Sequence, residues 1–247
     1  MVDMNRVLRC SRLSEWAYGD LQQFKDNLVA HDYSTKSLKF FNYKGAQAYG
    51  METKTGEIVV VFRGTEPTQV SDIIADLKAW PSASETVGMV HDGFKDELDK
   101  IANKIMEWMP SKKDKTVICT GHSLGAAMAS LFAARLSAMD NDVELYTFGS
   151  PRVGDKTWAA QFDNIKAYRF INNNDLVCRV PTDLYYEHVG EVYYFAYTGK
   201  MMVNVGAWSR FKDRIKSRLR CLIKLELFDS LYDHKIPKYI KRIEENK

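Results

Sequence analysis

Five residues, 121–125 (GHSLG), constrain the fold of this chain more than any others. The preceding residues 116–119 (TVIC) are apolar and partly β-branched, which indicates a buried strand, and residues 126–136 (AAMASLFAARL) predict a helix. A Gly-x-Ser-x-Gly between a strand and a helix is typical of a nucleophile elbow, where glycines relieve crowding around a serine on a strained turn. The pattern predicts that Ser123 forms an acyl-enzyme. The alternative is a glycine-rich connection with a bystander serine.

Strand and helix patterns alternate along the rest of the chain. Helical spacing covers residues 7–17, and β-type runs follow at 37–43, 46–53 and 57–65. We expect one long helix at 93–108, further strands at 144–149 and 166–172, a helix at 155–162 and a hairpin at 185–197. This order predicts an α/β fold with a mostly parallel central sheet and helices on both faces. No linker interrupts it, so we expect a single domain over 1–247.

Bulk properties exclude several classes of protein. The net charge of +3 is too small to indicate nucleic acid binding. The four cysteines match no metal-ligand spacing, so no metal site is expected. The N-terminal segment has no continuous apolar core and no run approaches the length of a membrane span, which predicts a cytoplasmic protein.

A nucleophilic serine needs a base, and only two histidines follow Ser123 in the chain. His188 lies in an aromatic segment (YYEHVGEVYYF), where a packed, hydrogen-bonded structural role is favoured. His234 stands in a loop before the predicted C-terminal helix, the kind of position where catalytic side chains usually lie. We therefore predict His234 as the general base.

The orienting acid is predicted from the polar turn 172–175 (NNND), which directly follows a strand. Asp175 in this turn should lie at the carboxyl edge of the sheet, beside the elbow. Asp163 is a further competitor. Asp155 is expected to cap the helix that it precedes, and Asp183, close after a proline, to serve a turn.

An oxyanion hole needs at least two donors aimed at the developing negative charge. One should be the backbone N–H of Leu124, the residue after the nucleophile. The segment 62–65 (FRGT) ends the most hydrophobic strand, and there Thr65 offers both a backbone N–H and a hydroxyl. The alternative for this segment is a plain strand-ending turn.

Several motifs in order resemble one known family, the class 3 lipases, which are the fungal-lipase-like branch of the α/β-hydrolases. They are VVVFRGT, VHDGF, GHSLGAAMA, YTFGSPRVGD, NNNDLVCRVP and the pair Asp233-His234, and they span roughly residues 40–245. The resemblance implies an α/β-hydrolase fold and the same assignments: Ser123 as nucleophile, Asp175 as acid, His234 as base, and Thr65 with Leu124 in the oxyanion hole. It implies that catalysis needs no metal or cofactor, and that His91 is structural.

The resemblance implies a lipase or esterase that hydrolyses acylglycerols or other lipid-like esters. Two alternatives stay open: a phospholipase A1 or lysophospholipase at anionic membrane surfaces, and a non-catalytic lipid-binding module. By the same resemblance, the segment 66–80 is a candidate lid, because Val70, Ile73, Ile74 and Leu77 recur at helical spacing. An ordinary surface helix would show the same spacing.

Residues 208–224 form the most polarised segment of the chain. Trp208, Phe211, Ile215, Leu219 and Leu222 follow one helical stripe, flanked by seven basic side chains and a single acid. Such a helix can lie on an anionic membrane through its apolar stripe. The alternative is a stripe that packs on the core beneath a solvated basic face.

Overall fold

The computed structural model describes residues 2–65, 80–109, 115–223 and 232–247. The helices of the N-terminal half are α1 (Met4–Trp16), α2 (Leu21–Ala30), α4 (Asp92–Asp99) and α5 (Ala102–Trp108); those that follow are α6 (Leu124–Ser137), α7 (Lys156–Ala160), α8 (Ala207–Ile223) and α10 (Ile236–Glu245). The strands are β1 (Lys39–Tyr43), β2 (Ala46–Glu52), β3 (Ile58–Phe62), β4 (Pro81–Ala83), β5 (Met89–His91), β6 (Val117–His122), β7 (Val143–Phe148), β8 (Lys166–Asn172), β9 (Glu191–Phe195) and β10 (Met201–Val203).

Eight strands form the central sheet in the order β1-β2-β3-β6-β7-β8-β9-β10. The five strands from β3 to β9 are parallel to one another, whereas β1, β2 and β10 add antiparallel edges. The predicted mostly parallel sheet is therefore confirmed. Because parallel strands end at the same edge, the loops after β6, β7 and β8 meet there.

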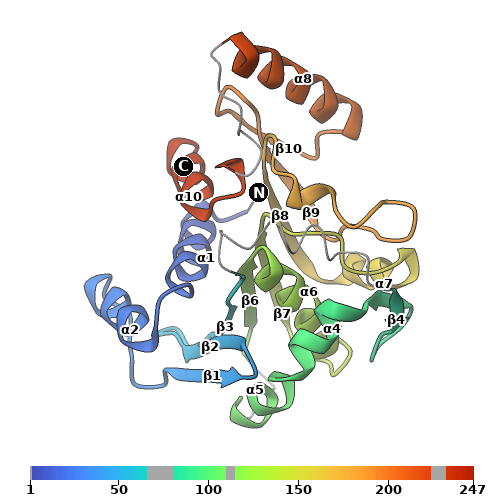
Figure 1. Ribbon diagram of the computed structural model, residues 1–247. Coiled ribbons are helices and arrows are strands. Elements are labelled where there is room, and N and C mark those ends of the chain that lie inside the picture. Colours follow the sequence, from blue (N-terminus) through green and yellow to red (C-terminus); the bar gives the residue numbers. More distant parts are fainter. Residues whose placement is uncertain (1, 66–79, 110–114, 224–231) are drawn as a thin grey trace.

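Alternate residues of β3 pack into two separate hydrophobic layers. Val59 and Val61 pack with side chains of α1, α2 and α10, while Val60 and Phe62 pack with side chains of α4, α5 and α6. Figure 1 shows these two groups of helices on opposite faces of the sheet. Burial on both faces explains why the strand is apolar throughout its length.

Two expectations about local structure are wrong. The helix expected at 93–108 is interrupted, because Ile101 leaves the helical region with φ −125° and buries its side chain in the core between α4 and α5. The segment 185–197 is not a hairpin. β9 pairs in parallel with β8, and its antiparallel partner β10 lies beyond a turn at Gly199 (φ +91°).

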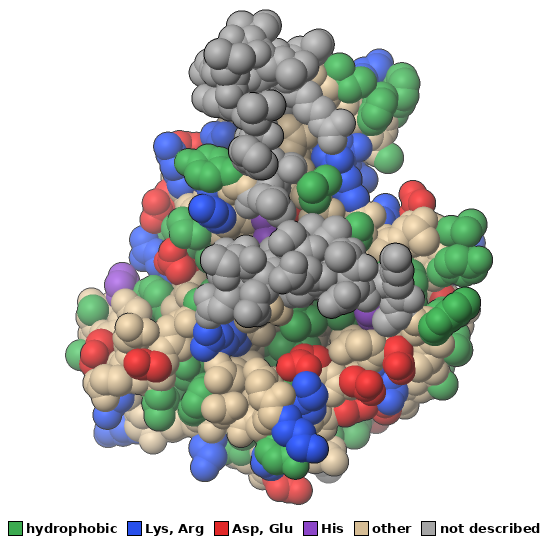
Figure 2. All heavy atoms as spheres, in the orientation of Figure 1, with side chains coloured by type: hydrophobic (Ala, Val, Ile, Leu, Met, Phe, Trp, Pro, Cys, Tyr) green, Lys and Arg blue, Asp and Glu red, His purple; other side chains and the backbone are tan. Residues whose placement is uncertain are grey.

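The helix α8 projects from the rest of the molecule (Figure 1) and confirms the helix predicted from residue 208, as far as residue 223. Its stripe does not pack on the core where the side chains are described: Trp208, Phe211 and Ile215 are 66%, 44% and 42% exposed. Figure 2 shows hydrophobic and basic side chains together at this projecting end. The side chains of Leu219 and Leu222 lie outside the described part.

None of the described helices combines the length and apolar composition needed to cross a membrane. The candidate lid at 66–80 lies outside the described residues, apart from the 85% exposed Trp80.

Candidate active site

Ser123 occupies a strained turn between β6 and α6. Its φ of 60° and ψ of −128° lie in a region that non-glycine residues rarely adopt, at a cost of about 1–3 kcal/mol. The two flanking glycines make this turn possible. A Cβ at Gly121 would clash with the carbonyl group of Gly125, and a Cβ at Gly125 would clash with the carbonyl oxygen of Phe62. The predicted strand, elbow and helix are therefore present.

Asp175 and His234 form a buried pair at the same edge of the sheet. The Nδ1 atom of His234 lies 2.9 Å from Oδ2 and 3.0 Å from Oδ1 of Asp175. Asp175 follows β8 and His234 precedes α10, so they meet across 59 positions of sequence. Their exposed fractions are only 1% and 3%. This geometry lets the carboxylate fix the tautomer of the imidazole, with the proton on Nδ1 and Nε2 free to accept one.

Two further donors hold the carboxylate of Asp175. The hydroxyl of Tyr239 donates to Oδ2 at 2.5 Å, and the backbone N–H of Val177 donates to Oδ1 at 2.8 Å. Burial by itself raises the pKa of Asp175, but His234 and the Tyr239 hydrogen bond outweigh it and leave the pKa below its ordinary value. Asp175 is therefore an anion in the folded protein.

The loop that carries His234 is tied to the turn that carries Asp175. The side-chain amide of Asn172 donates to the carbonyl oxygen of Asp233 at 2.9 Å, and the backbone N–H of Asn174 donates to Oδ2 of Asp233 at 3.1 Å. These bonds connect two residues just before Asp175 with the residue just before His234. They restrict the relative movement of base and acid.

His122, the residue before the nucleophile, also holds the base. Its Nε2 lies 2.6 Å from the carbonyl oxygen of His234, and its Nδ1 lies 2.7 Å from the hydroxyl of Tyr18. Because a carbonyl oxygen only accepts, Nε2 carries the proton and Nδ1 accepts from Tyr18. Burial, reinforced by the neighbouring His234, lowers the pKa of His122 to about 3, so this ring stays neutral.

The nucleophile and the base lie at the same strand end. The backbone N–H of Ser123 donates to the carbonyl oxygen of Phe148 at 3.1 Å, and the His234 ring lies against the next residue, Gly149. In the described part of the chain, Nε2 of His234 has no hydrogen-bond partner. In the predicted reaction this ring atom takes the proton of Ser123, and such bonds commonly tighten only when substrate binds.

The two predicted oxyanion residues share a cavity. Thr65, at the end of the segment after β3, and Leu124, the first residue of α6, line a space of about 330 Å³ together with Gly64 and Met128. Backbone N–H groups at the start of a helix stabilise a nearby negative charge. The structure thus brings Thr65 and Leu124 together, and their roles in catalysis stay predictions.

Other sequence predictions can be placed around this site. Asp155 accepts the backbone N–H of Trp158 at 2.7 Å, which confirms it as the cap of α7. His188 lies 2.9 Å, through Nε2, from the carbonyl oxygen of Cys178, as a structural histidine would. His91 stacks on Phe94 with ring centroids 4.1 Å apart.

Sequence reasoning missed four residues of the site: Tyr18, His122, Asn172 and Tyr239. His122 lies inside the elbow motif and Asn172 inside the polar turn, so both had a local signal. Tyr18 and Tyr239 had none, because their partners are 104 and 64 positions away in the chain.

Comparison with known proteins gives a consistent result. The family described as Lipase (class 3) matches residues 59–185, just over half of the chain. A lipase of Rhizomucor miehei is 33% identical over 65% of this chain and 47% of its own length. The toxin TseL of Vibrio cholerae is 38% identical over 44% of this chain and 18% of its own length. The chain thus spans less than half the length of these two relatives.

Solved structures share the fold. A triacylglycerol lipase, described as having a serine protease triad at its catalytic centre, has a TM-score of 0.69 at 23% identity, over 94% of this chain and 92% of its own. The triacylglyceride lipase of Rhizomucor miehei has a TM-score of 0.62 at 25% identity, over 81% of this chain and 83% of its own. The family match confirms the resemblance drawn from the motifs, and the chain belongs to the class 3 lipases.

Proposed function

We propose that this protein is a serine carboxylic ester hydrolase that acts on acylglycerols through an acyl-enzyme intermediate. One observation carries the proposal: a serine on a strained elbow and a buried Asp175–His234 pair stand at the same edge of the sheet. The family match and the relatives named as lipases support the substrate class.

The reaction follows from these positions. The hydroxyl oxygen of Ser123 attacks the ester carbonyl while Nε2 of His234 takes its proton. The resulting oxyanion accepts hydrogen bonds from the backbone N–H of Leu124 and from Thr65, and losing one such donor typically costs ~3–4 kcal/mol. The intermediate collapses to the acyl-serine, and His234 protonates the departing alcohol.

Water completes the cycle by the same route. His234 takes a proton from a water molecule, which attacks the acyl-serine. The second tetrahedral intermediate then releases the fatty acid while His234 returns the proton to the oxygen of Ser123. Asp175 keeps the imidazole in the required tautomer and stabilises its positive charge in both steps.

The test uses a fluorophosphonate probe and an acylglycerol assay. We expect the wild-type protein to be labelled and to release fatty acid from tributyrin, and Ser123→Ala to lose both activities. Ser137→Ala, at the far end of the same helix α6, is the matched control and should keep both. Labelling that persists in Ser123→Ala would refute the assignment of the nucleophile.

We also propose that α8 contacts anionic membranes peripherally. The exposed Trp208, Phe211 and Ile215 support this proposal, as does Lys212, whose ammonium lies 5.3 Å from the centre of the Trp208 ring. Trp208→Ala should reduce flotation with anionic vesicles, whereas Leu184→Ala, which removes a 72% exposed side chain elsewhere, should not. Equal flotation of all three proteins would contradict the proposal.

A further inference from the structure

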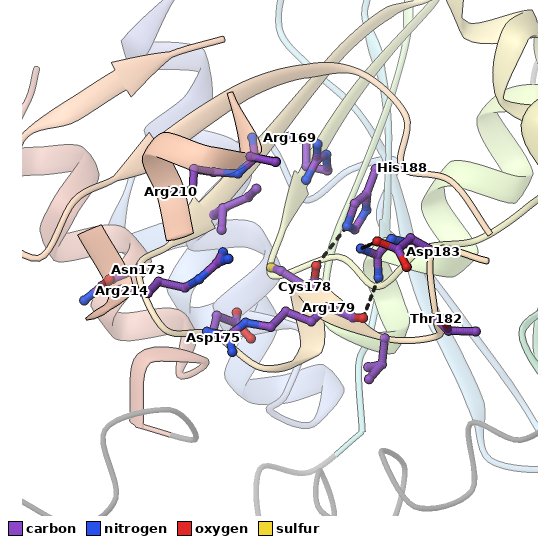
Figure 3. Close-up of a pocket in the computed structure, with 14 residues that line it drawn as sticks. Arg169, Asn173, Asp175, Cys178, Arg179, Thr182, Asp183, His188, Arg210 and Arg214 are labelled. Atoms are coloured by element: carbon purple, nitrogen blue, oxygen red, sulfur yellow. Dashed lines mark hydrogen bonds and ion pairs between the residues drawn. The ribbon is translucent and has the colours of Figure 1, made fainter. Parts of the chain in front are cut away.

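A second cavity lies behind the catalytic acid. It has a volume of about 520 Å³ and is bordered by β8, by the short helix η3 (Val177–Arg179) that follows it, and by the start of α8. Its lining is dominated by arginine side chains. They are Arg152, Arg169, Arg179, Arg210 and Arg214. Figure 3 shows the labelled arginines around a common space, with His188 at one side and Asp175 at the other.

Arg169 is the most informative of these arginines. It projects from β8 and is only 6% exposed, yet its Nε and Nη1 atoms have no hydrogen-bond partner in the part of the chain that the structure describes. Burial, together with the nearby charges of Arg210 and Arg152, lowers the pKa of Arg169 to about 10. A buried guanidinium without a counter-ion is costly, which indicates that a partner is missing from the cavity.

The carboxylates of the cavity do not supply this partner. Asp175 is committed to His234, Tyr239 and the backbone of Val177. Asp183 is the other acid among the described lining residues; its side chain is 80% exposed and lies 3.6 Å from Arg152. Among the described residues of the lining, five arginines therefore face two aspartates, which leaves an excess of positive charge there.

The helix α8 is held so that its arginines face the cavity. Asp213 accepts hydrogen bonds from the hydroxyl of Tyr194 at 2.8 Å and from the backbone N–H of Tyr197 at 3.0 Å. This anchors the helix beside β9. Arg210 and Arg214, one helical turn apart, then line the cavity while Phe211 stays exposed.

The side chain of His188 adds an uncharged group to the lining of the cavity. The Nε2 atom of His188 donates to the carbonyl oxygen of Cys178, so its buried Nδ1 is left as an acceptor without a partner in the described structure. Burial, together with Arg169 and Arg152, keeps the pKa of His188 well below its ordinary value. The ring can therefore accept a hydrogen bond from a hydroxyl on a ligand.

The geometry points to this cavity as a binding site for a phosphate-bearing ligand, held by Arg169, Arg210 and Arg214. Guanidinium groups from several directions match the several oxygens of a phosphate, and their planar forks bind such oxygens in pairs. The acceptor on His188 matches a P–OH or an alcohol beside the phosphate. The inference goes beyond ester hydrolysis, because none of these three arginines acts in the proposed reaction.

The test measures binding in the absence of any ester. Thermal unfolding at pH 7 is followed in sodium phosphate and in sodium chloride of equal ionic strength, and calorimetry gives the affinity for inorganic phosphate. We expect phosphate, and not chloride, to raise Tm in a saturable way. Arg214→Gln should weaken phosphate binding by about tenfold or more, because it removes a charge-assisted hydrogen bond.

The control lies on the same helix. Lys212→Gln removes one positive charge outside the cavity lining and should leave phosphate affinity unchanged. A phosphate effect no larger than that of chloride would overturn the proposal, and so would equal weakening by Arg214→Gln and Lys212→Gln. Arg169→Met should abolish the rise of Tm with phosphate. In phosphate-free buffer the Tm of this variant should be no lower than that of the wild type. If that variant does not fold, Arg214→Gln carries the test.

A second pair of measurements identifies the source of the phosphate. Vesicles of phosphatidylcholine are compared with vesicles that also contain phosphatidic acid. Recruitment to phosphatidic acid that falls further in Arg214→Gln than in Lys212→Gln assigns the site to a lipid headgroup, because both variants remove one charge from the proposed membrane contact of α8. Phosphate binding without such recruitment assigns it to a soluble phosphate compound. Because no ester is cleaved, the outcome is independent of the proposed hydrolase activity.

Discussion

Gly149 lies under the catalytic pair and offers a sharp test of its geometry. It follows β7 with φ +59°, and a Cβ built there would lie 2.9 Å from Oδ2 of Asp175 and 3.0 Å from both Nδ1 and Cε1 of His234. These separations are shorter than ordinary van der Waals contact. In Gly149→Ala the base and the acid must therefore move by a few tenths of an ångström.

Two effects of different kind are expected from Gly149→Ala. The left-handed backbone conformation should cost about 1–2 kcal/mol in stability for any residue with a Cβ. The displaced pair should lower kcat by ~10–100-fold, since a misplacement of 1 Å typically costs ~100-fold. KM should change little, because no substrate contact of the oxyanion cavity is altered.

Gly56→Ala separates these two effects. Gly56 also has a positive φ, +82°, but a Cβ there would have nothing within 4 Å. Its alanine variant should lose stability in thermal unfolding and keep the kcat of the wild type for tributyrin. The reasoning is refuted if Gly149→Ala keeps full kcat, or if Gly56→Ala loses as much kcat as Gly149→Ala.

Two further predictions concern His122. Tyr18→Phe removes the hydroxyl that donates to Nδ1 of His122 and leaves a buried acceptor unsatisfied, so the free energy of unfolding should fall by about 1–3 kcal/mol. The kcat should also fall, because His122 holds the backbone of His234. Urea unfolding and ester kinetics check both effects, and an unchanged free energy of unfolding would contradict the reasoning. In the folded protein the pKa of His122 is about 3, so the ring stays neutral above that pH. In the unfolded chain the same ring takes up a proton near its ordinary pKa of 6.5. The contribution of this group is thus complete above pH 6.5 and is lost as the pH falls toward 3, with a slope of up to ~1.4 kcal/mol per pH unit. His122→Gln should flatten this dependence, and an equally steep profile would show that another group causes it.

The elements that sequence reasoning predicted correctly depend on neighbours in the chain. The run 58–62 is apolar at every position because both of its faces are buried, and the elbow is recognisable because two glycines flank Ser123. Asp155 was predicted as a cap from its place before a helix. Each of these signals is carried by a few consecutive residues.

The wrong predictions concern features that depend on residues far apart in the chain. The break at Ile101 arises where α4 and α5 each pack their own apolar residues into the core, and periodicity alone does not reveal it. The pairing of β9 with β8 instead of with residues just before it is a choice of partner between distant segments. The exposure of Trp208 and Phe211 likewise depends on where α8 projects, since the stripe itself fits either a core or a membrane.

The sequence by itself determined the nucleophile elbow and the mostly parallel sheet, because local backbone preferences and apolar spacing encode them. Only the tertiary structure decided how the base is held. Tyr18, His122 and the carbonyl group of His234 form one hydrogen-bonded chain, although they lie 104 and 112 positions apart. The arginine cavity behind Asp175 also depends on the tertiary structure, because its arginines come from separate elements that include β8, η3 and α8. Contacts between distant segments depend on packing, which no local pattern records.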